Sequence, residues 1–167
     1  MKTLALSILS LGLLGAVSSQ ASAIGILLDA PSQSGVPGDT LVFRGVITNL
    51  DLENAVFLNS YDLNIVAPDL AVDGLDDFFN NVPISLDAGA SSGLIELFTV
   101  TIANPTLDPL GTFFGTYTLK GGADGGAADI LGFADFDVTE TPEPGSLILL
   151  AGGMLTLVGR YVRVPRI

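Results

Sequence analysis

Residues 111–120, which read GTFFGTYTLK, alternate between apolar and polar side chains over most of their length. In a β-strand, successive side chains point to opposite faces, so alternating apolar and polar residues indicate a strand with one buried face. Here the apolar face is formed by Phe113, Tyr117 and Leu119, and the polar face by Thr112, Thr116 and Thr118. The stretch therefore predicts a half-buried strand.

The same alternation occurs in residues 41–48, 57–65, 94–103 and 130–138, with Gly, Pro, Asn or Asp between the stretches. No part of the middle of the chain keeps a helical period over three turns. The residues expected to point inward are Leu41, Phe43, Ile47, Tyr61, Leu63, Ile65, Phe98, Val100, Ile102, Ile130, Phe136 and Val138. Several short strands at this spacing predict an all-β fold, a single antiparallel β-sandwich of immunoglobulin-like topology over residues 24–141. A closed barrel is the alternative.

The N-terminal residues 1–23 have the layout of a secretory signal peptide. Lys2 precedes an apolar stretch, residues 4–17, and small residues follow at Ala21 and Ala23. This order predicts a signal helix, cleavage by signal peptidase after Ala23, and export of the rest of the chain. An N-terminal core helix is the alternative interpretation.

Residues 142–167 contain a second apolar run, 146–159, between a turn and a basic end. The turn contains Pro142, Glu143 and Pro144, and the basic residues are Arg160, Arg163 and Arg166. The run predicts a short hydrophobic helix that spans the inner membrane with its C-terminus in the cytoplasm, because basic residues stay on the inside. A buried amphipathic helix is the alternative, although Thr156 is the only polar residue between Leu147 and Val158.

Together, Pro142-Glu143-Pro144, the apolar run and the basic end resemble the PEP-CTERM sorting signal of exported bacterial proteins. The resemblance implies a Gram-negative source, recognition by an exosortase, and removal of the tail before transfer to the envelope surface or the medium. It also implies a link to extracellular polysaccharide and biofilm. Residues 37–49 and 111–120 resemble bacterial Ig-like and cohesin-like surface modules.

Composition limits the chemistry of the middle segment. The sequence has 18 acidic and 6 basic residues and contains no Cys, His or Trp. Thiolate nucleophiles, imidazole bases and His or Cys metal sites are therefore excluded. All the acidic residues lie between Asp29 and Glu143, where only Arg44 and Lys120 balance them, so nucleic acid is not expected as a partner.

An acidic cluster around Gly74 is the candidate metal site, formed by Asp69, Asp73, Asp76 and Asp77. Oxygen-rich clusters outside the cell suggest calcium. The spacing departs from an EF-hand loop, since Ala71 and Asn80 occupy the third and twelfth positions counted from Asp69. Asp124 and Asp129 form a second acidic loop. The other interpretation is that all these carboxylates are solvated loop charge and that no cofactor is bound.

Asp135 and Asp137 lie on one face of a predicted strand and are the only pair considered for acid–base hydrolysis. Their alternation with apolar residues predicts instead an outward polar face. Tyr61 and Tyr117 are the candidates for stacking on a sugar. We therefore expect a non-enzymatic envelope or matrix protein with a structural or adhesive role, or alternatively a calcium- or carbohydrate-binding surface module.

Overall fold

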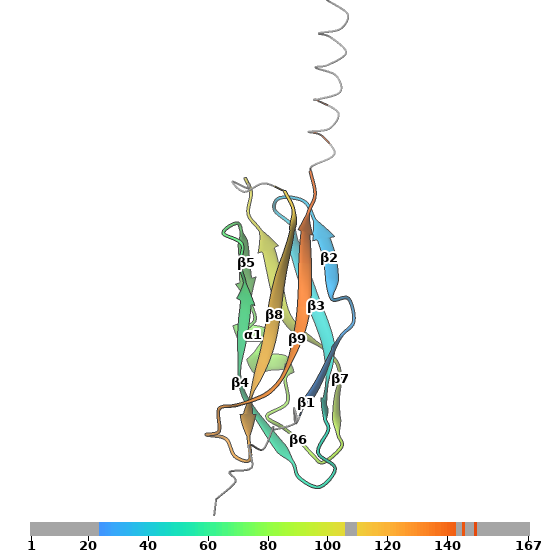
Figure 1. Ribbon diagram of the computed structural model, residues 1–167, viewed down its shortest axis with the longest axis vertical. Helices are drawn as coiled ribbons and strands as arrows, with labels where there is room; N and C mark the ends of the chain where they lie inside the picture. The colour runs from blue at the N-terminus through green and yellow to red at the C-terminus, as the bar shows by residue number, and fades with distance from the viewer. Residues whose placement is uncertain (1–23, 106–109, 143–144, 146–148, 150–167) are drawn as a thin grey trace, which may run out of the picture.

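The computed structural model describes residues 24–105, 110–142, 145 and 149. They form two β-sheets and one short helix (Figure 1). Sheet A has the strand order β1 (Ile24–Leu28), β3 (Thr40–Asn49), β7 (Ser91–Ile102), β5 (Leu70–Asp73). Sheet B has the order β2 (Ser32–Gly35), β9 (Asp129–Glu140), β8 (Thr112–Gly122), β4 (Val56–Ile65), β6 (Ser85–Leu86). The all-β sandwich prediction is confirmed at this level, and the two separate sheets exclude the closed barrel.

The core lies between the sheets and is built from the inward faces of the long strands. Phe98, Val100 and Ile102 of β7 are fully buried, and so are Tyr117 and Leu119 of β8. Threonines occupy the alternate positions of both strands, as the sequence predicts. Burial of these side chains is the main term that stabilises a chain without disulfides.

One strand pair is parallel, which corrects the prediction of a purely antiparallel sandwich. β1 pairs antiparallel with β3 in sheet A, but β2 pairs parallel with β9 in sheet B. Pro31 stands between β1 and β2, and its carbonyl accepts a hydrogen bond from the Asp137 N–H at 2.9 Å. Proline has no N–H to continue the first ladder, so the chain leaves sheet A there and joins sheet B.

The start of β9 also differs from the sequence pattern. Ile130, which the alternation places in the core, is 67% exposed, whereas Leu131 is 4% exposed. The register shifts between Leu119 and Lys120 of the neighbouring strand, so that Lys120 pairs with Ile130. Leu131 is therefore an extra, unpaired residue of β9, and such a bulge puts Ile130 on the opposite face from the one that a strict period of two predicts.

Helix α1 (Leu75–Asn81) has no counterpart in the sequence prediction. It follows β5 and precedes β6, so it connects sheet A to sheet B along one side of the sandwich (Figure 1). Phe78 is its buried residue. Asp76 and Asp77, assigned to a loop from sequence, lie in its first turn.

The two flanking helices predicted from the sequence fall mostly on residues that the structure does not describe. Residues 1–23, Glu143, Pro144 and the arginines Arg160, Arg163 and Arg166 lie outside the described residues. Within the part that is described, no helix has both the length and the apolar character needed to cross a bilayer.

Candidate functional site

A hollow of about 380 Å³ lies at one lateral edge of the sandwich. It is lined by residues 60–63 of β4, residues 72–75 at the junction of β5 and α1, and Phe78 and Phe79 of α1. We call it the edge groove. β5 ends sheet A on this side, and β4 is the neighbour of the short terminal strand of sheet B.

An aromatic stack connects the edge groove to the core. The ring of Tyr61 lies 5.7 Å from that of Tyr117 and 5.3 Å from that of Phe78, measured between centroids. Tyr117 stacks in turn on Phe98 at 5.3 Å, and Phe98 stacks on Phe43 at 4.7 Å. Such aromatic pairs add stability beyond the area they bury, so the inner wall of the groove is packed directly on the core.

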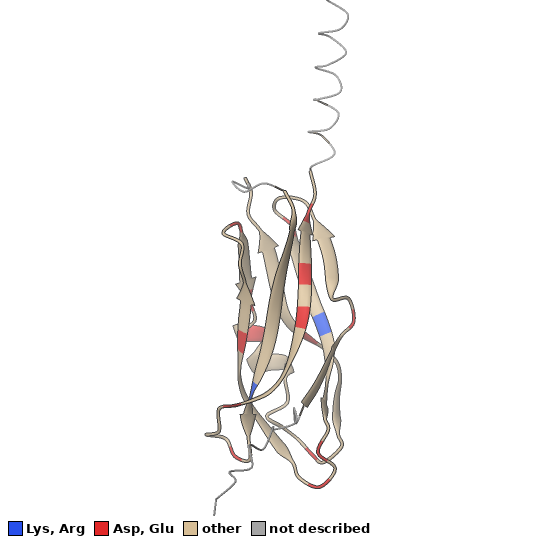
Figure 2. Cartoon of the chain, viewed as in Figure 1, with Lys and Arg blue, Asp and Glu red and all other residues tan. Residues whose placement is uncertain are grey.

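The groove is bordered by negative charge. Asp62 forms an ion pair with Lys120. The pKa of Asp77 is raised by burial and by the carboxylates of Glu96, Asp73 and Asp76. Figure 2 shows how strongly acidic positions outnumber basic ones over the described chain. The α1 side of the groove therefore carries like charges that repel one another.

Tyr117 is fully buried behind the groove, which removes it as a sugar-stacking residue. Burial raises the pKa of its hydroxyl, with smaller contributions from Tyr61 and Asp77. Within the described residues this hydroxyl has no hydrogen-bond partner. Tyr61, the other predicted stacking residue, does line the groove.

The predicted calcium residues are distributed over three local structures. Asp69 precedes β5, Asp73 ends that strand, and Asp76 and Asp77 begin α1. Asp73 Oδ1 accepts a hydrogen bond from the Leu75 N–H at 3.2 Å. In residues 24–105 and 110–142, no group of at least three carboxylates is close enough together to hold a metal ion.

The second acidic loop is organised by its own backbone. Asp124 Oδ1 accepts a hydrogen bond from the Gly126 N–H at 2.8 Å. Asn59 donates to the carbonyl oxygens of Asp124 and Ala127, which fastens the loop to β4. Asp129 is the first residue of β9. These contacts explain the loop as a structural turn.

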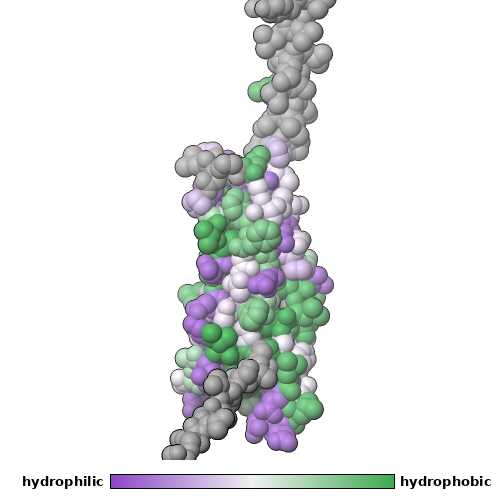
Figure 3. Space-filling view, viewed as in Figure 1, coloured by the Kyte–Doolittle hydropathy of each residue, from purple (hydrophilic) through white to green (hydrophobic). Residues whose placement is uncertain are grey.

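Asp135 and Asp137 lie on the outer face of sheet B, on the same side as Phe114. The Asp135 carboxylate accepts a hydrogen bond from Thr116 at 2.9 Å, and that of Asp137 accepts one from Ser32 at 2.5 Å. Phe114 is 76% exposed beside them, paired with Asp137 in the register. On the face shown in Figure 3, hydrophobic and hydrophilic side chains are interspersed. The outward orientation predicted for these aspartates is confirmed.

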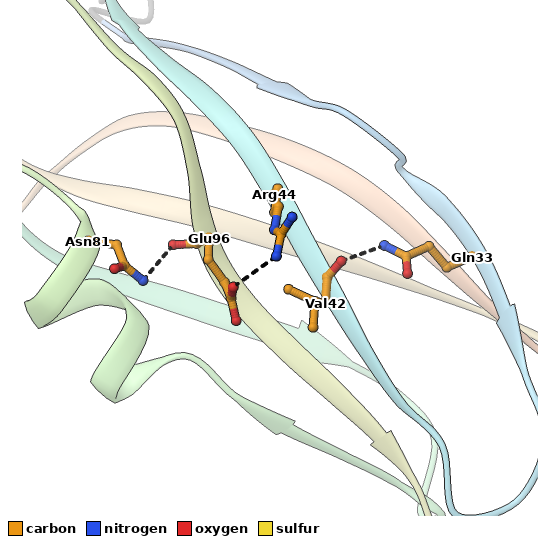
Figure 4. A network of polar contacts seen from close by, with 5 residues as sticks. All are labelled: Gln33, Val42, Arg44, Asn81 and Glu96. Atoms are coloured by element: carbon orange, nitrogen blue, oxygen red, sulfur yellow. Dashed lines mark hydrogen bonds and ion pairs between the residues drawn. The ribbon is translucent and has the colours of Figure 1, made fainter.

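A polar network crosses the outer face of sheet A (Figure 4). Arg44 of β3 lies 3.6 Å from Glu96 of β7, whose carbonyl accepts a hydrogen bond from Asn81 of α1 at 3.3 Å. On the other side, Gln33 donates to the Val42 carbonyl at 2.9 Å. The network ties α1 to β7 and β2 to β3. Arg44 is 57% exposed, so its ion pair adds little stability.

No protein-family model matches the chain, and no curated protein sequence matches it. Among solved structures, it is similar to a family 123 glycoside hydrolase from Clostridium perfringens, studied for glycolipid glycan hydrolysis. The identity is 10% and the TM-score 0.36; the match covers 70% of this chain and 27% of that one. The chain thus corresponds to about a quarter of that enzyme's length, and the likeness is too distant to assign an activity.

The sequence alone does not reveal the edge groove, because its lining comes from three elements, β4, β5 and α1. Tyr61 was expected to face the core, and Phe78 and Phe79 belong to the helix that was not predicted. The adjacent pair Phe78-Phe79 inside an acidic segment was the available signal. One of the two had to be exposed, and Phe79 is 72% exposed.

Proposed function

We propose that the chain is an exported, non-enzymatic protein of the cell envelope or extracellular matrix. In this proposal, residues 1–23 direct export, residues 142–167 are a PEP-CTERM sorting signal processed by an exosortase, and the sandwich is the part presented outside. A structural or adhesive role linked to extracellular polysaccharide or biofilm rests on the resemblance alone.

The observation that supports this proposal best is that all the described strands lie between the two predicted processing sites. Ile24 of β1 is 2% exposed and paired with Asn49, so a chain cleaved after Ala23 keeps this strand. Its last strand ends at Glu140, just before Pro142. Cleavage after Ala23 and loss of residues 142–167 would therefore leave every described strand intact.

We also propose that the two sheets have immunoglobulin-like topology. In immunoglobulin domains one sheet has the order A-B-E-D and the other contains G-F-C. Sheet A follows the first order if β1, β3, β7 and β5 are read as A, B, E and D. In sheet B, β9, β8 and β4 then take the places of G, F and C. The strand order supports this assignment.

The two ends of the sandwich also suit presentation from a membrane. In Figure 1, β1 begins at the end of the sandwich opposite to the one where β9 finishes. A membrane anchor after β9 would therefore place the β3–β4 and β8–β9 loops farthest from the bilayer.

A non-enzymatic role is proposed because the only carboxylate pair considered for catalysis stands on an open sheet face. Asp135 and Asp137 each accept a hydrogen bond from a neighbouring hydroxyl, and neither lines the edge groove. Glycosidase carboxylates flank the scissile bond from both sides, which two residues on one flat face do not do.

Processing tests the proposal in a Gram-negative host that has an exosortase, compared with the same host lacking it. We expect the tail to be lost only where the exosortase is present. Replacing Pro142 and Glu143 by Ala should leave the unprocessed chain in the membrane fraction. An antibody against the sandwich detects it there, and added protease shows on which side of the membrane the sandwich lies. The matched control, Pro68→Ala, changes an exposed proline in the turn before β5 and should be processed normally. Equal processing of all variants would exclude a sorting role for the motif.

A ligand-binding surface module is the second candidate, and the edge groove favours it. Tyr61 and Phe79 offer aromatic surface there, and Ser60 and Asp62 offer polar groups. Oligosaccharide titration followed by Tyr fluorescence tests this candidate, with Phe79→Ser as the variant that should lose the response.

A further inference from the structure

The edge groove lies along the open edge of a β-strand. It is lined by four consecutive residues of β4, Ser60 to Leu63. Consecutive side chains of a strand point to opposite faces, so a hollow that touches all four must lie beside the backbone edge. The groove is therefore a place where another extended chain can approach main-chain groups.

This edge of β4 is uncovered in the described part of the chain. β8 pairs with β4 from Phe57 to Ile65 on one side, but β6 pairs only with Val56 and Phe57 on the other. Alternate residues from Ser60 to Ile65 thus direct their N–H and C=O groups away from β8, and those among residues 60–63 face the groove. Unpaired edges of this kind accept an added strand.

Apolar surface lies next to these main-chain groups. Leu75 and Phe79 are 56% and 72% exposed, and both line the groove. Tyr61 and Phe78 form its aromatic inner wall. Every second side chain of an added strand would point onto this wall, which is how strand addition obtains specificity.

The negative charge at the groove favours a cationic partner. Asp73 lines it, and Asp76 and Asp77 stand on the helix that borders it. Neither Lys nor Arg lines it. The only basic residues of the described chain, Arg44 and Lys120, are already paired with Glu96 and Asp62. A second copy of the chain would bring like charges together, whereas a cationic segment would relieve their repulsion.

We propose that the edge groove binds an extended peptide segment with alternating basic and apolar side chains, which adds as a strand to the open edge of β4. The apolar side chains pack on Tyr61 and Phe79, and the basic ones face Asp73 and Asp76. This inference is independent of the sorting proposal, since it concerns the sandwich itself.

The test uses the purified full chain and two labelled synthetic peptides, KVKVTVKV and its charge-reversed form EVEVTVEV. Fluorescence anisotropy should give a dissociation constant at least about tenfold lower for the basic peptide, with the difference shrinking as salt is added. Hydrogen exchange should slow at the amides of residues 60–65. Phe79→Ser and Asp76→Lys, both at exposed positions, should each weaken binding about fivefold or more.

Phe114→Ser is the matched control, because Phe114 is equally exposed but lies on the outer face of sheet B. It should bind the basic peptide as the native chain does. Three results would each overturn the proposal. The first is that the basic peptide does not bind at about 1 mM. The second is that the acidic peptide binds equally well, and the third is that peptide binding slows hydrogen exchange around Phe114 instead of at residues 60–65. Self-association of the chain through β4 would overturn it as well.

Discussion

The ring of Tyr61 stacks on the ring of Tyr117, with 5.7 Å between their centroids and an angle of 16° between their planes. Tyr61 lines the edge groove and Tyr117 is fully buried, so the wall of the groove is also the end of the hydrophobic core. Changes in the core therefore reach the groove through aromatic contacts, this one and that of Tyr61 with the buried Phe78.

The Tyr117 hydroxyl makes stability fall at alkaline pH. Its pKa in the folded state lies above the ordinary value, so above about pH 10 the unfolded chain releases this proton while the folded chain keeps it. The free energy of unfolding should drop by about 1.4 kcal/mol per pH unit there, and less steeply in Tyr117→Phe. Urea unfolding at several pH values measures the free energy of unfolding, and tyrosinate absorbance measures the ionisation of the tyrosines.

Tyr117→Phe should also stabilise the protein at neutral pH. The hydroxyl is buried and has no hydrogen-bond partner within the described residues, so removing it relieves a desolvation cost of about 1 kcal/mol. A loss of stability in this variant would show that the hydroxyl has a partner.

Asp77→Asn should raise the melting temperature at neutral pH. Burial and the charges of Glu96, Asp73 and Asp76 hold the pKa of Asp77 above its ordinary value, so ionisation opposes folding. This contribution to stability is present below about pH 4 and is lost as pH rises. Calorimetry should show an increase of a few degrees at pH 7 that disappears near pH 3. Glu53→Gln, remote from this cluster, should show no such difference.

Calcium should not stabilise the sandwich, because no group of at least three carboxylates in the described residues is close enough to hold an ion. Melting temperature should stay constant as calcium is raised to about millimolar concentration. Replacing Asp73 and Asp76 by Asn should change it little, since an asparagine at position 73 can still accept the Leu75 hydrogen bond. If submillimolar calcium raised the melting temperature of the native chain and not that of the double variant, a calcium site would be established.

Gly121→Ala should destabilise the sandwich by about 3 kcal/mol. A Cβ at this position would lie 1.9 Å from the Phe57 carbonyl oxygen, inside the pairing of β4 with β8. Gly125→Ala, in the loop that follows, meets nothing within 4 Å and serves as the control. Urea unfolding of both variants gives the comparison, and equal stabilities would show that β4 can shift freely.

Asn49→Ala should cost about 2–3 kcal/mol. Asn49 is 1% exposed, its amide nitrogen lies 2.9–3.2 Å from the carbonyls of Asn54, Leu86 and Asp87, and its oxygen accepts from the Asp51 N–H. The residue thus holds the loop after β3 against the loop before β7. Asn64→Ala, at an exposed position of β4, should cost little in the same unfolding assay.

The long strands could be predicted from the sequence because their pattern is local. Phe43, Phe98 and Tyr117 lie inward as their alternation requires, and all three are fully buried. The prediction was wrong for Ile130, because an extra residue in β9, Leu131, breaks the alternation against β8. Register shifts depend on the partner strand, which the local pattern does not contain.

The edge groove could not be predicted, because it depends on contacts between distant segments. Tyr61 reaches Phe78 only after β4, β5 and α1 have folded against one another. Asn49 resembles a turn residue in the sequence, and its hydrogen bonds to Leu86 and Asp87 join residues far apart in the chain. The helix spans only Leu75–Asn81, too short for its period to be recognised.

If the sandwich is the exported and processed part of the chain, the mature protein has lost both ends. Intact-mass spectrometry of the protein recovered from the envelope surface or the medium measures this loss. We expect a chain that begins at Ile24 and lacks Arg160, Arg163 and Arg166. Recovery of a chain that still carries residues 1–23 or the arginine-bearing tail would contradict this expectation.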